Sequence, residues 1–174
     1  MSILKLLGLK VSEIQDGPDT QAIRKIADQL GRLEPDKARY LAAFAYILSR
    51  AAHADLTISD KETRTMERIV SEIGNLPAEQ AVLVVHMAKS QNLLFGGTED
   101  FLVTREFEKI ATREQKLALL ECLFAVSASD ESISVAEDSV IRQITSELKL
   151  DHRDFISVRS EFRDHLEVLK KKEE

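Results

Sequence analysis

Two short stretches of the chain carry the residues best suited to chemistry, and they share the pattern D-x-x-I-S-x-x-E. The first copy places Asp55 and Glu62 seven residues apart, and the second places Asp130 and Glu137 at the same spacing. Clustered carboxylates are the ligands that hard cations such as calcium, magnesium and manganese prefer. The pattern therefore predicts a divalent-cation site at Asp55, Glu62, Asp130 and Glu137.

Half of this pattern also has a purely structural explanation. Ser59 stands three residues before Glu62, and Ser134 stands three residues before Glu137. A serine followed by glutamate at this spacing forms a capping box, in which the hydroxyl accepts a hydrogen bond from the third helical amide and the glutamate accepts one from the amide of the serine. An Asx turn would account for the aspartates in the same way. Cation binding and helix capping are therefore both compatible with the sequence.

Other kinds of site find no support in the sequence. An EF-hand needs glycine at the sixth position of its loop, but the chain has Asp60 and Val135 there. The sequence contains no glycine-rich phosphate loop, no Gly-x-Ser-x-Gly elbow and no paired histidines at zinc-site spacing. We therefore expect no enzyme activity and no cofactor other than a divalent cation. A hydrolase that uses paired carboxylates is kept as an alternative, because two nearby carboxyl groups can divide the acid and base roles.

The composition indicates a helical protein that binds neither nucleic acid nor the membrane interior. The 174 residues include only six glycines and three prolines, which is untypical of β-sandwiches and barrels. The net charge of −6 opposes binding to phosphate backbones, and no apolar stretch approaches the roughly 18 residues that span a bilayer. The single Cys122 cannot form an internal disulfide. We expect a cytoplasmic protein with a protein partner.

Hydrophobic periodicity predicts an all-α bundle of seven or eight helices with an internal repeat. Residues 41–73 and 116–148 align at a fixed offset of 75 residues, and each copy contains an apolar helix, a loop with the acidic pattern and an amphipathic helix. We expect the two copies to pack about a pseudo-twofold axis. Residues 1–18 are expected to form a leader or linker, and residues 19–174 a single domain.

Two of the predicted helices are apolar around most of their circumference, which is typical of helices surrounded by others. They cover residues 38–54 and 114–128, and we expect them at the centre of the bundle. The last predicted helix begins near Asp151 and continues to Leu169 on the strength of its apolar face.

The acidic stretches resemble the tellurite-resistance TerB family, including the TerB-like domain of some J-domain co-chaperones. The matching segments are AHADLTISDKE at residues 52–62 and SASDESISVAE at residues 127–137. In that family an apolar helix ends in Ala-Asp-Gly and is followed by a hydrophobic residue, a serine and a spaced glutamate, twice in one all-helical domain. This chain has Leu56 and Glu131 where the family usually has glycine.

The resemblance implies a noncatalytic helical module that acts in tellurite or envelope-stress responses. It further implies divalent-cation binding at the acidic loops, and we add to it the expectation of a protein partner. A dedicated cation-binding or cation-sensing protein is the alternative function.

Overall fold

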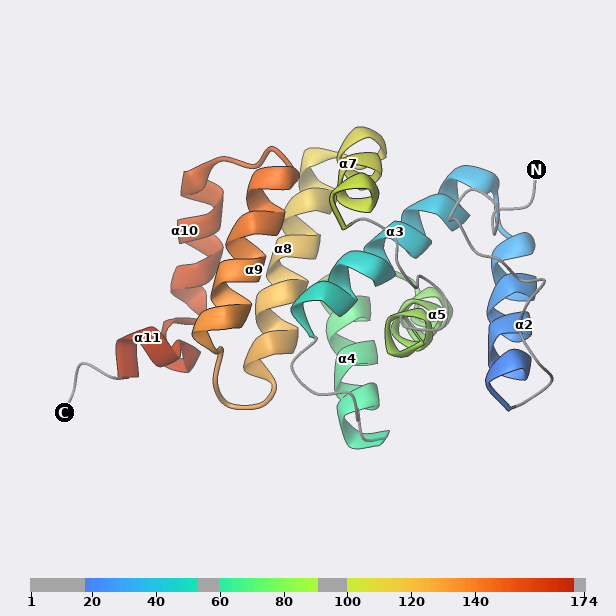
Figure 1. Cartoon of the computed structure of the whole chain (residues 1–174), viewed down its shortest axis with the longest axis horizontal. Helices are drawn as coiled ribbons and strands as arrows, with labels where there is room; N and C mark the ends of the chain where they lie inside the picture. Colours follow the sequence, from blue (N-terminus) through green and yellow to red (C-terminus); the bar gives the residue numbers. More distant parts are fainter. Residues whose placement is uncertain (1–17, 53–59, 91–99, 171–174) are drawn as a thin grey trace.

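The computed structural model describes residues 18–52, 60–90 and 100–170, and these are almost wholly helical (Figure 1). The α-helices are α2 (Pro18–Gly31), α3 (Pro35–Ala51), α4 (Asp60–Glu72), α5 (Ala78–Lys89), α7 (Asp100–Ile110), α8 (Arg113–Ala128), α9 (Val135–Glu147), α10 (His152–Glu161) and α11 (Glu167–Lys170). One turn of 3-10 helix, η2 (Arg163–His165), precedes α11. No strand occurs in these three ranges, and the predicted all-α fold is confirmed.

The described residues form nine α-helices rather than seven or eight, because the last predicted helix is divided. α10 ends at Glu161, η2 follows, and Leu166 is extended with a ψ of 113°. Leu166 forms a parallel bridge with Ile133, which lies in the loop before α9. A residue held in this extended conformation cannot continue an α-helix, so the prediction of one helix from Asp151 to Leu169 was wrong.

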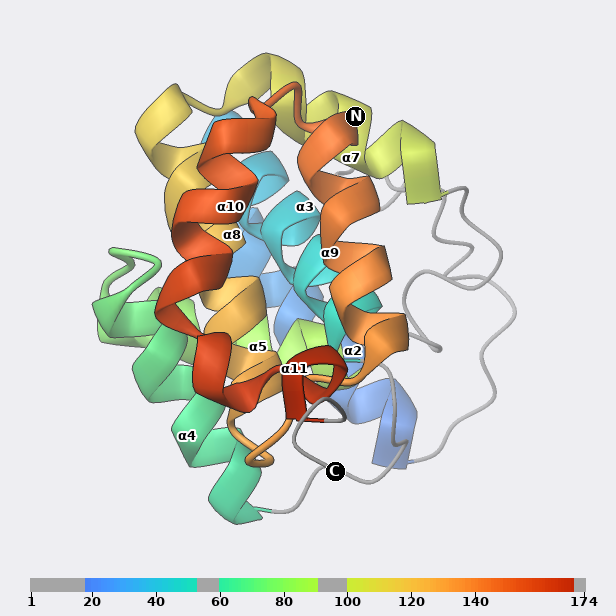
Figure 2. The same cartoon turned by 90° about the vertical axis from the view of Figure 1, so that its left-hand side faces the viewer.

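The two central helices predicted from their apolar sequences are α3 and α8. Residues 40–51 of α3 and residues 122–127 of α8 are all buried. α3 packs against α5, α7, α8 and α9, while α8 also packs against α4, α9 and α10. Figure 2 shows α3 in the interior, behind α9 and α10. Each apolar helix thus contacts the amphipathic helix of the other predicted repeat, α3 with α9 and α8 with α4, while the pseudo-twofold symmetry itself stays a prediction.

Aromatic side chains fill the core in both halves of the chain. Tyr40 and Phe44 of α3 meet Phe107 of α7, with ring centroids 5.2 and 6.2 Å from that of Phe107. Phe124 of α8 meets Phe155 of α10 at a centroid separation of 5.7 Å. Such pairs stabilise a fold by about 0.5–1.5 kcal/mol beyond the burial of their surface, and they fix α7 and α10 against the two central helices.

Candidate functional site at the second acidic loop

The second copy of the acidic pattern lies in the short loop between α8 and α9. Ser134 is the N-cap of α9, and its hydroxyl accepts a hydrogen bond from the amide of Glu137 at 3.2 Å. The Glu137 carboxylate accepts one in return from the amide of Ser134 at 2.8 Å. The capping interpretation of this serine and glutamate is therefore confirmed. Ile133, between the loop and the cap, is buried with 1% of its surface exposed.

The carboxylates at the tip of the loop are exposed. Asp130 and Glu131 both face solvent, and Glu131 adopts a left-handed backbone conformation with a φ of 69°. This conformation favours glycine, because a Cβ atom there crowds the following carbonyl. The loop therefore makes the turn that the family's glycine would make, although the glycine is replaced by glutamate.

The C-terminal part of the chain binds this loop directly. We call residues 163–170, which comprise η2, Leu166 and α11, the C-terminal clasp. The amide of Ile133 donates to the carbonyl of His165 at 2.6 Å, and the amide of Glu167 donates to the carbonyl of Ile133 at 3.1 Å. The ammonium of Lys170 donates to the carbonyl of Glu131 at 3.1 Å. These contacts could not be predicted from the sequence, because residues 163–170 fit a continuous helix.

A nearby carboxylate, that of Asp138, already binds a side chain of α10. Asp138, in the first turn of α9, accepts two hydrogen bonds from the guanidinium of Arg159 on α10, at 2.8 and 3.0 Å. This bidentate pair has the geometry of the stronger charge-assisted bonds. The second loop is thus held in place by its cap, by the clasp and by the contact between α9 and α10.

The described residues do not bring a set of metal ligands together. No three His, Cys, Asp or Glu side chains within the described ranges are placed to hold an ion. Asp55 and the Ser59 cap lie outside those ranges, whereas Glu62 lies half-buried on α4. The second loop alone therefore does not fit a cation site, and the four-residue site that includes Asp55 stays a prediction.

A buried ion pair elsewhere in the core was missed by the sequence reasoning. Arg50, near the end of α3, donates to the two carboxylate oxygens of Glu147 on α9 at 2.7 and 3.3 Å and to the hydroxyl of Thr104 on α7 at 2.7 Å. The side chains of Arg50 and Glu147 are only 6% and 9% exposed. Burial acts to raise the pKa of Glu147, but hydrogen bonding and the charge of Arg50 outweigh it and leave the pKa below its ordinary value. An arginine inside an apolar helix needs such a partner. The position of Arg50 in the apolar sequence of α3 was therefore the feature that could have indicated a buried ion pair.

The described residues form an all-helical protein in which the second copy of the acidic pattern connects α8 to α9 and caps α9. The family model described as "Tellurite resistance protein TerB" matches residues 40–160, and the chain belongs to this family. No curated protein and no solved structure matches the chain. Within the described ranges, none of the helices combines the length and apolarity required to cross a membrane.

Proposed function

We propose that the chain is a noncatalytic cytoplasmic module that acts in a stress response, of the tellurite or envelope type, by binding a partner protein. The observation that carries the proposal is the second acidic loop, where Asp130 and Glu131 are exposed on a backbone held by the cap and the clasp. Catalysis by paired carboxylates needs a pocket that perturbs them. Recognition of a partner needs polar groups exposed on a rigid support, which is what this loop offers.

A dedicated divalent-cation protein is the competing proposal. Its ligands would be the four predicted carboxylates, and calcium, magnesium or manganese would be the ion. The bonds of the second loop favour partner binding, because Glu137 already caps α9 and the carbonyl of Glu131 already accepts from Lys170. Neither group needs a cation to complete its hydrogen bonding.

Thermal unfolding of chelator-treated protein separates the two proposals. A cation that binds only the native state raises its stability by about 2.7 kcal/mol at a hundredfold excess over the dissociation constant. We expect calcium, magnesium and manganese to leave the unfolding temperature of the wild type unchanged. Stabilisation by one of these metals that disappears in the Asp55→Asn/Asp130→Asn variant would instead establish a cation-binding protein. The Asp28→Asn/Asp36→Asn variant, with the same change of charge on α2 and α3, is the control.

A further inference from the structure

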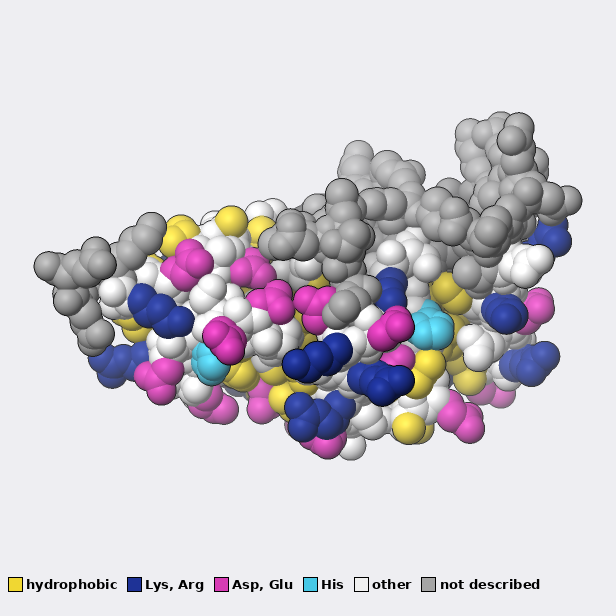
Figure 3. Space-filling view, turned by 90° about the horizontal axis from the view of Figure 1, so that it is seen from below, with side chains coloured by type: hydrophobic (Ala, Val, Ile, Leu, Met, Phe, Trp, Pro, Cys, Tyr) yellow, Lys and Arg dark blue, Asp and Glu magenta, His cyan; other side chains and the backbone are white. Residues whose placement is uncertain are grey.

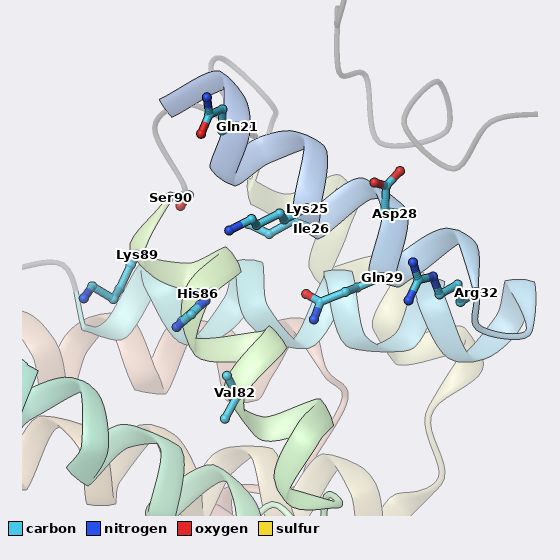
Figure 4. A pocket seen from close by; sticks show the side chains of 10 residues that line it. All are labelled: Gln21, Lys25, Ile26, Asp28, Gln29, Arg32, Val82, His86, Lys89 and Ser90. Carbon is cyan, nitrogen blue, oxygen red and sulfur yellow. The ribbon is translucent and has the colours of Figure 1, made fainter. Parts of the chain in front are cut away.

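A groove with a cavity volume of about 680 Å³ lies between α2 and α5 (Figure 4). One side is formed by Lys25, Asp28 and Gln29, which share one face of α2, and by Arg32 in the turn just after that helix. The other side is formed by one face of α5: Val82, His86 and Lys89. In Figure 4, Lys25 and Gln29 reach from α2 toward His86 on α5.

The charge of the groove is opposite to that of the chain. Its lining includes three Lys or Arg side chains and one carboxylate, that of Asp28, whereas the chain as a whole has 24 basic and 30 acidic residues. A further carboxylate, that of Glu67, lies 3.9 Å from the ring of His86. Figure 3 shows the molecule from below, where Lys and Arg side chains lie interspersed with Asp and Glu side chains. The groove is thus a local basic surface on an acidic protein.

The cations of the groove are spread along its length rather than gathered at one point. Lys25 lies within α2, and Arg32 lies in the turn after Gly31, the last residue of that helix, which is about 9 Å further along the helix axis. Lys89 stands on the opposite helix, where its ammonium donates to the hydroxyl of Thr63 at 2.8 Å. A phosphate-sized anion cannot meet side chains so distributed, whereas carboxylates on successive turns of a peptide can.

Apolar surface lies between these cations. Val82 on α5 is 38% exposed, and Ile26 on α2, which also lines the groove, is almost wholly buried. Apolar residues flanked by charge on two neighbouring helices can accept an amphipathic helix, whose apolar stripe enters the groove while its polar flanks meet the walls. The complementary flanks here are acidic.

We propose that the groove between α2 and α5 is the docking site for an acidic amphipathic helix of a partner protein. Its apolar stripe contacts Val82, and its glutamates or aspartates pair with Lys25, Arg32 and Lys89. This inference rests on the proposed partner-binding function and adds a second contact surface to the acidic loop between α8 and α9. The surface is separate from the acidic loop between α8 and α9, so each can be altered without the other.

Fluorescence anisotropy with the full chain tests the assignment. The probe is a labelled peptide of about 14 residues, or four helical turns, with leucine on one face and glutamate elsewhere. We expect saturable binding that weakens as salt is added, and an affinity about tenfold lower for Lys25→Glu/Arg32→Glu. The control Arg105→Glu/Arg153→Glu, which changes the net charge equally on exposed residues of α7 and α10, should bind as the wild type does.

Four results would overturn the docking site. Equal losses in the two double variants would mean that net charge alone drives binding. Undiminished binding of a glutamate peptide without leucines, or full competition by inorganic phosphate, would mean that the groove takes anions rather than a helix. Absence of binding by the wild type would rule out the groove as a docking site but would not contradict the proposed function, whose cation-binding alternative is tested separately by the metal-dependent unfolding experiment.

Discussion

Removal of the buried arginine tests the energetic reasoning most directly. Arg50→Met keeps a long apolar stem on α3 and so leaves little cavity, but it leaves the carboxylate of Glu147 buried without its cation. Breaking a buried pair in this way costs about 3–5 kcal/mol, because the remaining charge has lost its solvent and its partner. In a protein of this length 1 kcal/mol shifts the unfolding temperature by about 2–4 °C. We therefore expect a decrease of about 6–20 °C.

The stability difference between the wild type and Arg50→Met should also depend on pH, in a direction that follows from the pKa of Glu147. In the wild type the pKa of Glu147 is lowered from its ordinary value of 4.5, so its contribution to stability is present above that value and is lost as pH falls through the lower folded-state pKa. In Arg50→Met burial, the largest influence on the pKa of Glu147, still acts to raise it, and only the weaker hydrogen bonds of Gln143 and Thr104 oppose it. The variant can then protonate the buried carboxyl, so the stability gap between wild type and variant should narrow as pH falls from about 7 to about 5.

Urea unfolding followed by circular dichroism at both pH values measures these differences. The double variant Arg50→Met/Glu147→Met is the matched control, because it removes both charges and should recover most of the lost stability. If Arg50→Met loses less than about 1 kcal/mol of unfolding free energy, the Arg50–Glu147 pair contributes no more than an exposed ion pair does. That result would refute the predicted cost of a buried, unpaired carboxylate. A gap that widens toward acid pH would do the same.

Three further predictions concern single positions. Glu131→Gly should raise the free energy of unfolding by about 0.5–1 kcal/mol, since glycine adopts the φ of 69° without strain; an equal gain for Glu131→Ala would contradict this cause. Gly74→Ala should lower the unfolding free energy by about 1–3 kcal/mol, because its Cβ would meet the carbonyl oxygen of Val70, while Gly31→Ala, which meets nothing within 4 Å, should not. Cys122 is buried, and its pKa is raised to about 12, mainly by burial. A disulfide reagent should therefore label this thiol only in urea, and rapid labelling of the native protein would contradict its burial.

The elements that the sequence predicted correctly depend on local patterns. The central helices α3 and α8 followed from runs of apolar residues, and the cap of α9 followed from Ser134 and Glu137, which are three residues apart in the chain. Such signals work because the groups that interact are neighbours in sequence, so their spacing already determines whether they can meet.

The elements that the sequence did not predict depend on contacts between distant residues. Arg50 and Glu147 are 97 residues apart, and an isolated arginine in an apolar helix indicates that a partner exists without indicating which. The C-terminal clasp was not predicted for a related reason. Residues 163–170 favour a helix locally, but the bridge from Leu166 to Ile133 outweighs that preference. The turn at Glu131 was obscured because the residue type that usually marks it is missing.

The enclosure of α3 decides how this chain can be divided for laboratory use. Because helices on both sides of the α5–α7 connection cover α3, a fragment that ends after α5 would expose the apolar surface that α7, α8 and α9 normally bury. The complementary fragment would in turn lack the helix that fills its interior. Truncation is therefore a poor way to obtain a minimal domain, whereas two separately produced fragments should assemble with each other, which suits the chain to use as a split reporter.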